Sequence, residues 1–168
     1  MIHVCSLSRL HATVEETGAR HVVTLLKNTD QVQRPAVIVQ DNHLILSMDD
    51  IIEELEGYSA PAHTHVEQLV DFVGRWQREA PMVVHCYAGI SRSTAGAFVA
   101  ACALNPGRDE MQIAWALRRA SRTATPNARI VALADKLLDR KGRMSKAIET
   151  IGPGEMAYEA VPFRLDLD

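Results

Sequence analysis

The sequence predicts an α/β domain in which a mainly parallel central sheet is flanked by helices, with a helical C-terminal third. Apolar, β-branched segments alternate with helical patterns over the first two thirds of the chain, and only helical patterns follow. The length of 168 residues fits one domain, and 47% hydrophobic and 23% charged residues are ordinary for a globular chain. Intrinsic disorder is excluded, because a disordered chain has too few apolar residues to form a core.

Four segments in the first 50 residues are predicted strands, because they are rich in apolar and β-branched side chains. They are Ile2–Cys5, His21–Leu26, His43–Met48 and, as a further candidate, Ala36–Val39. A short acidic helix is expected at Ile51–Glu56. The stretch Gly57–Pro61 is a predicted loop, since Gly and Pro both break regular structure.

The next segment is a predicted helix ended by Pro81, because apolar residues recur there at helical spacing. Its apolar stripe consists of Val66, Leu69, Val70, Val73 and Trp76. Met82–His85 is a predicted buried strand with apolar residues on both faces, as in the middle of a parallel sheet. The chain then turns at Cys86–Ser91 and enters a helix that Asn105–Gly107 ends.

The C-terminal third is helical by pattern, with candidates at Arg108–Ala120, at Met144–Ile151 and from Pro126 to Leu138. Pro126 would occupy a favoured position in the first turn of its helix. We expect residues 1–152 to form a single domain and residues 153–168 to form an extended C-terminal tail. In this tail Val161, Phe163, Leu165 and Leu167 alternate as in a strand, so the tail could lie along the body.

Charge and cysteine content exclude several classes of protein. The net charge of −3 argues against a nucleic-acid partner, since such domains are more often basic. The longest near-continuous apolar stretch, Ala95–Leu104, is half of the ~20 residues that a membrane-spanning helix needs, and the N-terminus has no secretory pattern. The three cysteines form no CxxC pair, so we expect no disulfide framework, no metal and a reducing cytoplasmic location.

The residues that point to a chemistry lie in one segment, His85-Cys86-Tyr87-Ala88-Gly89-Ile90-Ser91-Arg92-Ser93-Thr94. The buried strand brings Cys86 to the carboxyl edge of the sheet, where open α/β sheets bind ligands. The loop that follows leads into a helix near Ser91 or Arg92. Its backbone N–H groups and the positive end of the helix dipole therefore form a cradle for an anion.

Four residues of this segment suit phosphate chemistry. Cys86 lies at the floor of the cradle, and helix N-termini favour the thiolate form of a cysteine. The planar guanidinium of Arg92 matches two phosphate oxygens. The Ser93 hydroxyl can donate to the sulfur, and Gly89 leaves room where the backbone must approach the ligand closely.

The run His-Cys-x5-Arg-Ser resembles the signature of the cysteine-based protein tyrosine phosphatases. The longer run VVHCYAGISRSTA is similar to their dual-specificity branch and its small bacterial relatives. Upstream, an apolar strand, an Asp and a loop follow one another as in the family, and Thr125-Pro126-Asn127 resembles a family element that braces the phosphate loop. The resemblance covers most of residues 1–150, leaves the tail uncovered, and implies the fold of these phosphatases.

The resemblance also implies roles for individual residues. Cys86 is the expected nucleophile of a phosphocysteine intermediate, and Asp50 is the expected general acid and base. Ser93 eases departure of the sulfur, and His85 and Asn127 support the loop. The phosphate oxygens are expected to bind the Arg92 side chain and the backbone N–H groups of Tyr87, Ala88, Gly89, Ile90, Ser91 and Arg92. No metal or other cofactor is implied.

Two adjacent aspartates are candidates for the general acid. We prefer Asp50 because it follows the alternating Leu44, Leu46 and Met48 and lies at the edge of the loop, and Asp49 is the alternative. Asp50 also precedes the expected helix directly, where it would be a good N-cap, and the two roles could coexist.

Other candidate side chains have simpler interpretations. Cys5 and Cys102 fit the core, although either could instead pair with oxidised Cys86 as a resolving thiol. His63 and His65 are expected on the surface or in packing, since no third metal ligand is apparent.

Three functions agree with these residues. We favour a phosphomonoester hydrolase of the protein tyrosine or dual-specificity type. The alternatives are a pseudophosphatase that binds phosphorylated ligands and an arsenate reductase. The expected partner is a phosphorylated protein, with phosphotyrosine, phosphoserine or phosphothreonine, or a small phosphomonoester. Tyr87–Ser91 contains no Lys or Arg to hold further phosphates, which disfavours a polyphosphorylated lipid. No oligomeric state is predicted.

Overall fold

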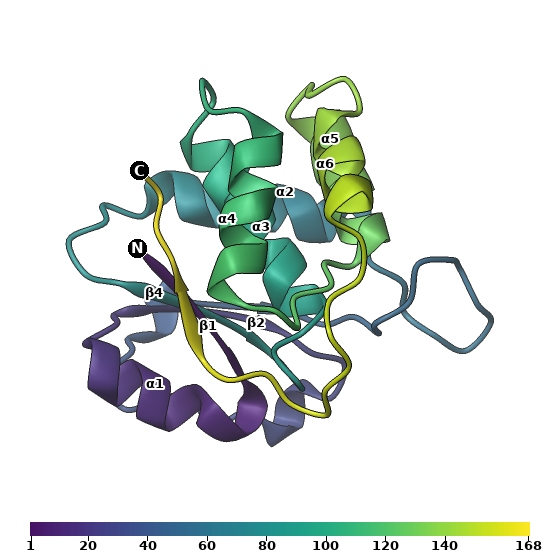
Figure 1. Cartoon of the computed structure of the whole chain (residues 1–168). Helices are drawn as coiled ribbons and strands as arrows, with labels where there is room; N and C mark the ends of the chain where they lie inside the picture. Colours follow the sequence, from purple (N-terminus) through teal and green to yellow (C-terminus); the bar gives the residue numbers. More distant parts are fainter.

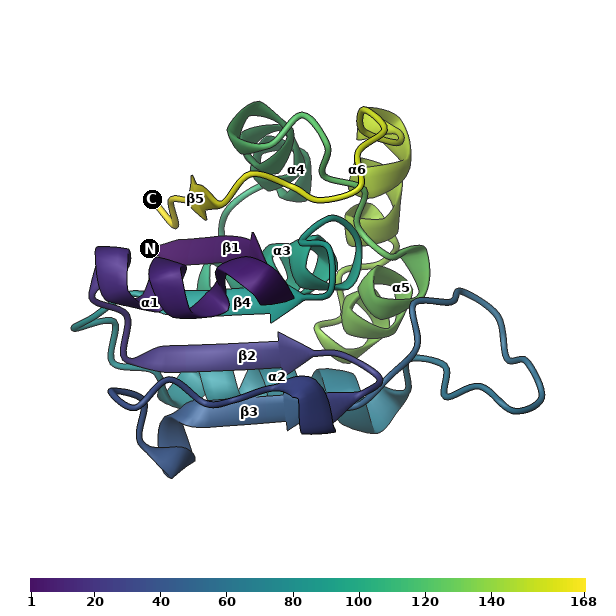
Figure 2. The same ribbon diagram turned by 90° about the horizontal axis from the view of Figure 1, so that it is seen from below.

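The computed structural model describes residues 1–168 and contains one five-stranded sheet with the order β3-β2-β4-β1-β5. The strands are β1 (Ile2–Ser6), β2 (His21–Leu25), β3 (His43–Leu46), β4 (Met82–Cys86) and β5 (Phe163–Leu165). Strands β1 to β4 are parallel to one another, and β5 pairs antiparallel with β1. Figure 2 shows the strands in this order. The predicted α/β class with a mainly parallel sheet is confirmed.

Six helices cover the two faces of the sheet unequally. They are α1 (Leu10–Thr17), α2 (His63–Arg75), α3 (Arg92–Leu104), α4 (Glu110–Ala120), α5 (Ala128–Leu137) and α6 (Arg143–Ile151). Helix α1 lies on one face, and the other five helices lie on the opposite face (Figure 1). None of the six combines the length and the apolar character needed to cross a membrane.

Helix α3 occupies the centre of the larger layer, and its composition explains why. Its residues from Arg92 to Cys102 are all buried, and many of them are small. A Cβ atom built on Gly96 would lie 3.2 Å from side-chain carbons of Leu25 and Val84, so the helix packs very close to the sheet. This close packing holds the N-terminus of α3 against the end of β4, on either side of the loop that follows Cys86.

Two predicted elements are absent. Ala36–Val39 is a turn rather than a strand, because the Ile38 N–H donates to the Pro35 carbonyl at 2.9 Å and only Ile38 of the apolar residues is buried. Ile51–Glu56 is an irregular loop rather than a helix. Ile52 and Leu55 are exposed there, so the segment has no apolar stripe with which to pack a helix.

One helix was not predicted, and another begins later than expected. Helix α1 was not anticipated, because only Leu10, Thr13 and Val14 are buried in its eight residues and the apolar pattern is short. Pro126 lies before helix α5 rather than in its first turn. The N-cap is Asn127, whose Oδ1 accepts the Ile130 N–H at 3.1 Å.

The connection between β3 and α2 projects from the body as a long loop (Figures 1 and 2). Asp49 and Ser59 close its base with two hydrogen bonds. The Asp49 N–H donates to the Ser59 carbonyl at 2.8 Å, and the Ser59 N–H donates to the Asp49 carboxylate at 2.7 Å. The loop therefore begins at Asp50, directly beside the carboxyl edge of the sheet.

Candidate active site

Cys86 is the last residue of β4, and its side chain is almost fully buried at the carboxyl edge of the sheet. Its Sγ lies 3.1 Å from the Ser93 Oγ and accepts the Gly89 N–H at 3.3 Å. The loop from Tyr87 to Ser91 thus curls around the sulfur before α3 begins at Arg92. Within this loop Tyr87 is exposed, whereas Ala88, Ile90 and Ser91 are half-buried.

The carbonyl groups of this loop are bound from outside it. The Tyr87 carbonyl accepts the Leu7 N–H at 3.1 Å, and the Ala88 carbonyl accepts the Ala160 N–H at 2.9 Å. On the other side the Ile90 carbonyl accepts the Thr125 N–H at 2.9 Å, and the Ser91 carbonyl accepts the Asn127 N–H at 3.2 Å. Segments from three distant parts of the chain therefore brace the loop.

This bracing directs the N–H groups of the loop inward. A trans peptide holds its C=O and N–H in opposite directions, so each carbonyl that points outward turns the next residue's N–H toward the interior. The N–H groups of Ala88, Gly89, Ser91 and Arg92 follow such carbonyls. The Gly89 N–H indeed donates to the Cys86 Sγ, and the other three have no acceptor within the protein. Together with the N-terminus of α3 they have the arrangement that the sequence predicts for an anion cradle.

The structure adds a reason for Gly89 that the sequence did not show. Its φ is +76°, and a Cβ atom there would lie 2.9 Å from the Cys5 carbonyl carbon and 3.0 Å from the Ser6 nitrogen. The loop therefore approaches the backbone of β1 closely at Gly89, and a side chain there would not fit.

Arg92 is buried and turned back toward the loop that follows β3. Its Nη1 donates to the Met48 carbonyl at 2.9 Å, which fixes one end of the guanidinium. Its Nε is buried and has no hydrogen-bond partner. A buried guanidinium with a free donor fits an anion held next to the Cys86 sulfur.

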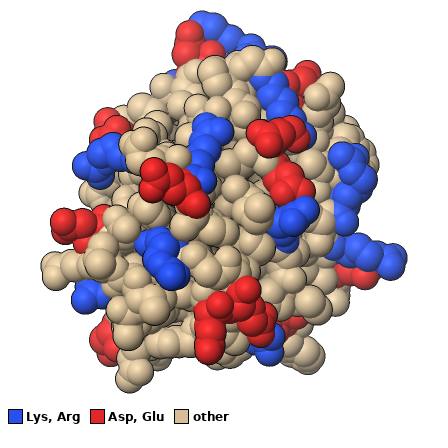
Figure 3. All heavy atoms as spheres, turned by 90° about the vertical axis from the view of Figure 1, so that its left-hand side faces the viewer, with Lys and Arg blue, Asp and Glu red and all other residues tan.

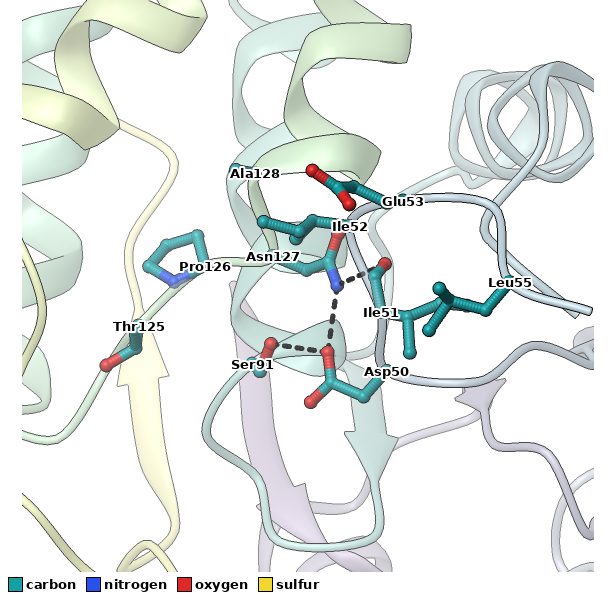
Figure 4. A pocket seen from close by; sticks show the side chains of 10 residues that line it. All are labelled: Asp50, Ile51, Ile52, Glu53, Leu55, Ser91, Thr125, Pro126, Asn127 and Ala128. Carbon is teal, nitrogen blue, oxygen red and sulfur yellow. Dashed lines mark hydrogen bonds between the residues drawn. The ribbon is translucent and has the colours of Figure 1, made fainter. Parts of the chain in front are cut away.

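The Asp50 carboxylate lies beside the loop and is held from two sides, as Figure 4 shows. Its Oδ1 accepts the Ser91 hydroxyl at 2.7 Å and the Asn127 Nδ2 at 2.8 Å, whereas Oδ2 has no such bond. Asn127 Nδ2 also donates to the Ile51 carbonyl at 3.2 Å. Asn127 thus joins the start of the projecting loop to the start of α5, while its backbone braces Ser91.

Asp49 has different partners from Asp50. Its Oδ2 accepts the Ser59 N–H and lies 3.8 Å from the Lys27 Nζ. The carboxylate therefore closes the base of the projecting loop and makes no hydrogen bond to the Cys86 loop. The N-cap role considered for Asp50 is excluded, because no helix follows it.

His85 lies beneath the loop, fully buried on strand β4. The Thr24 hydroxyl bridges two rings, at 2.6 Å from His85 Nε2 and 2.8 Å from His43 Nε2. Burial lowers the pKa of His85 to about 4, so its ring is neutral near pH 7. Sequence reasoning did not find Thr24 or His43, and nothing distinguishes them there from ordinary strand residues.

The two other cysteines are buried in different parts of the core. Burial raises the pKa of both Cys5 and Cys102 to about 12, so both are protonated thiols. His63 pairs with Glu67 at 3.1 Å, and His65 Nδ1 accepts the Ala62 N–H at the start of α2. No three metal-ligating side chains cluster anywhere in the molecule.

A groove of about 700 Å³ runs from Asp50 along the projecting loop to the start of α5 (Figure 4). Its lining residues are Asp50, Ile51, Ile52, Glu53, Leu55, Ser91, Thr125, Pro126, Asn127 and Ala128. The groove shares Asp50, Ser91 and Asn127 with the candidate site. It offers apolar side chains and the carboxylates of Asp50 and Glu53 to whatever extends beyond the loop.

A protein-family model described as "Polymorphic toxin system, DSP-PTPase phosphatase" matches residues 6–108, which is more than half of the chain. The match includes β2, β3, β4, the Cys86 loop and Asp50, and it begins at the last residue of β1. No curated protein matches the chain.

Solved structures of phosphatases are similar to the chain in fold. Human DUSP28 has a TM-score of 0.64 and 18% identity, covering 83% of this chain and 89% of its own. The PTP-2 phosphatase of Cydia pomonella has a TM-score of 0.63 and 19% identity, covering 80% and 84%. PTPMT1, solved in complex with PI(5)P, has a TM-score of 0.61 and 15% identity, covering 90% and 94%. These likenesses establish the phosphatase fold that the sequence resemblance implied.

Proposed function

The chain belongs to the DSP-PTPase phosphatase family of polymorphic toxin systems, and from this premise we propose that it hydrolyses phosphate monoesters through a phosphocysteine intermediate. One observation carries the proposal. A single loop curls around the Cys86 sulfur, donates the Gly89 N–H to it, and leads directly into the buried Arg92, whose Nε has no partner in the protein. Such a site can hold three phosphate oxygens while a sulfur attacks phosphorus.

In the first step the Cys86 thiolate attacks phosphorus and forms an S–P bond. The P–O ester bond breaks, and the leaving oxygen takes a proton from Asp50. Arg92 and the loop N–H groups stabilise the charge on the three remaining oxygens in the transition state.

In the second step a water molecule attacks the phosphocysteine and gives its proton to the Asp50 carboxylate. The S–P bond breaks, and inorganic phosphate leaves. The departing Cys86 thiolate is stabilised by the Ser93 hydroxyl at 3.1 Å and the Gly89 N–H at 3.3 Å. Asp50 thereby returns to its protonated form, and the cycle is complete.

The hydrogen bonds of Asp50 support this role. Both donors, Ser91 and Asn127, bind Oδ1, so Oδ2 is the oxygen that can carry the transferred proton. The same two bonds fix the carboxylate beside the loop, which is what a general acid needs in order to reach the leaving oxygen.

We propose a substrate with a single phosphate, on a protein side chain or a small molecule, with phosphotyrosine the first candidate and phosphoserine and phosphothreonine next. One structural neighbour was solved with the phosphoinositide PI(5)P. In this chain the loop residues Tyr87–Ser91 include no Lys or Arg, and the adjoining groove carries Asp50 and Glu53. Carboxylates next to the site repel additional phosphates.

The mechanism uses no metal and no cofactor, and a reducing cytoplasm is the proposed location. All three cysteines are free thiols, which suits a nucleophile that must remain reduced.

The decisive experiment compares the wild-type chain with Cys86→Ser on an aryl phosphate such as p-nitrophenyl phosphate, in the presence of EDTA. We expect the wild-type chain to hydrolyse it with inhibition by vanadate, and Cys86→Ser to lose turnover while keeping its fold and phosphate binding. A serine hydroxyl remains protonated in this cradle and is a far weaker nucleophile.

Other outcomes would assign another function. Vanadate binding without wild-type turnover would identify a module that only binds phosphorylated ligands. Turnover of arsenate with a thiol donor, in the absence of phosphatase activity, would identify a reductase. Substantial turnover by Cys86→Ser would remove Cys86 as the nucleophile.

A further inference from the structure

The C-terminal segment 152–165 runs from the end of α6 past the Cys86 loop to the edge of the sheet (Figures 1 and 2). It ends as β5, which pairs with β1 in register, Val4 opposite Phe163 and Ile2 opposite Leu165. The buried Leu165 and Leu167 anchor this end in the core. The segment therefore has a fixed path on both sides of the point where it meets the loop.

At that point the segment makes a direct hydrogen bond to the loop. The buried Ala160 donates its N–H to the Ala88 carbonyl at 2.9 Å. The peptide that carries this carbonyl also carries the Gly89 N–H, which donates to the Cys86 sulfur at 3.3 Å. Because a peptide unit is planar, holding its carbonyl outward holds its N–H on the sulfur.

Glu159 fastens the segment beside this contact. Its Oε1 accepts hydrogen bonds from the hydroxyls of Ser6, the last residue of β1, and Ser8, two residues further on. Ser6 is the register partner of Cys86, so Glu159 binds the strand that lies next to the candidate nucleophile. These hydrogen bonds hold the pKa of Glu159 below its usual range, so it remains a carboxylate near pH 7.

The first part of the segment contacts residues that bind the opposite side of the loop. The Gly154 N–H donates to the Thr125 hydroxyl at 3.0 Å, and the Glu155 N–H donates to the Arg122 carbonyl at 2.8 Å. A Cβ atom on Gly154 would lie 2.6 Å from the Arg122 carbonyl oxygen, so the contact is very close. Thr125 in turn donates its N–H to the Ile90 carbonyl.

We propose that Glu159 and Ala160 are positioning residues of the phosphatase site, which act through the Ala88–Gly89 peptide to aim the Gly89 N–H at the Cys86 sulfur and at a bound phosphate. The inference rests on the proposed function and adds the C-terminal segment to the site. Neither residue touches the substrate, and each acts by holding the loop.

Two variants test the contacts separately. Ala160→Pro removes the N–H that binds the Ala88 carbonyl, and Val161→Pro is its control, because Val161 is exposed and its N–H makes no hydrogen bond. Glu159→Ala removes the hydrogen bonds to Ser6 and Ser8. Asp166→Ala is its control, because Asp166 pairs only with Arg164.

The readouts are the pH dependence of Cys86 alkylation by iodoacetamide, with Cys86→Ser as the blank, and the affinity for vanadate. In Ala160→Pro and Glu159→Ala we expect the alkylation midpoint to move to higher pH and vanadate affinity to fall about tenfold, since one donor to a charged group is misdirected. The two controls should match the wild-type chain.

Neither readout requires turnover, so the two together test the positioning role even if the chain hydrolyses nothing. Melting curves monitored by circular dichroism identify any variant that does not fold. Glu159→Ala leaves the backbone unchanged and decides the outcome if Ala160→Pro fails to fold. A folded Glu159→Ala protein with the wild-type alkylation midpoint and vanadate affinity would overturn the proposal.

Discussion

Asp49 and Asp50 illustrate how two identical neighbouring residues acquire different roles from their contacts. Asp49 accepts a backbone N–H from Ser59 and closes the projecting loop. Asp50 turns the other way, and Ser91 and Asn127 hold its Oδ1 beside the Cys86 loop. From the sequence we preferred Asp50 to Asp49 as the general acid. The contacts of the two carboxylates support that preference.

We expect Asp50→Asn to slow hydrolysis most for substrates with poor leaving groups, such as phosphoserine, by ~10²–10⁴-fold in kcat. Nitrophenyl phosphate should lose less, because its leaving group needs less protonation. Asn keeps an Oδ1 that can accept from Ser91 and Asn127, so the loop should stay in place. The measurement is kcat for both substrates across a range of pH, where the basic limb of the profile should flatten.

Asp49→Asn is the matched control. It should leave the leaving-group dependence unchanged, because this carboxylate makes no hydrogen bond to the Cys86 loop. If Asp49→Asn rather than Asp50→Asn shows the selective loss, the assignment is wrong by one residue. If neither does, the acid lies elsewhere in the chain.

The element that carries the site is a strand, a tight loop and a helix, and its close contact with β1 depends on Gly89. The positive φ and the short distances to Cys5 and Ser6 mean that any side chain would strain the loop or move it away from the sheet. The N–H groups that face the sulfur would move with it.

Gly89→Ala should therefore destabilise the fold by roughly 1–3 kcal/mol and abolish most of the activity. Gly74→Ala is the contrasting variant. Gly74 lies in α2, where a Cβ atom meets nothing within 4 Å, so an alanine there should stabilise the helix by roughly 0.5–1 kcal/mol. Urea unfolding of both variants measures the difference, and a Gly89→Ala protein with wild-type stability and kcat would refute the argument.

The sequence predicts this element well because its determinants are local. An apolar strand, a cysteine, small residues and a helix start lie next to one another in the chain, so their geometry follows from short-range rules. The contacts that brace the loop are not local. Ala160 and Leu7 reach it through backbone N–H groups, which any residue except proline could supply, and Thr24 contacts His85 through a strand pairing that no spacing reveals. The acidic helix expected at Ile51–Glu56 failed for a related reason, since its apolar residues have no surface to cover.

At the scale of the whole molecule, the chain has two hydrophobic cores and a surface on which charges of both signs are mixed. The larger core lies between the sheet and α2 to α6, and the smaller one lies under α1. On the face drawn in Figure 3, acidic and basic side chains are interspersed, and no basic patch forms there. Beneath the surface, Glu110 is buried and pairs with Arg140 at 2.7 Å and Arg143 at 3.1 Å, which joins α4 to the loop before α6 and to α6 itself.

Folding also changes the proton affinity of most histidines. Burial lowers the pKa of five of the seven, namely His3, His21, His43, His65 and His85, and for His43 and His85 it does so to about 4. In the unfolded chain these rings have pKa values of about 6.5. Between about pH 6.5 and pH 4 the unfolded state therefore binds more protons than the folded state, and the free energy of unfolding falls as the pH is lowered.

The pair bridged by Thr24 provides the test of this pH dependence. Below about pH 4 the folded state also takes up the proton of His85, so the contribution of His85 to the slope ends there. We expect His85→Gln to reduce the slope of unfolding free energy against pH, between pH 5 and pH 6, by roughly 1 kcal/mol per pH unit, since one fewer proton is taken up on unfolding. His63→Gln, at an exposed position, should leave the slope as it is. Urea unfolding at intervals from pH 7 to pH 5 gives each slope, independently of any change in stability at neutral pH. Equal slopes for wild-type and His85→Gln proteins would show that folding does not lower the pKa of His85.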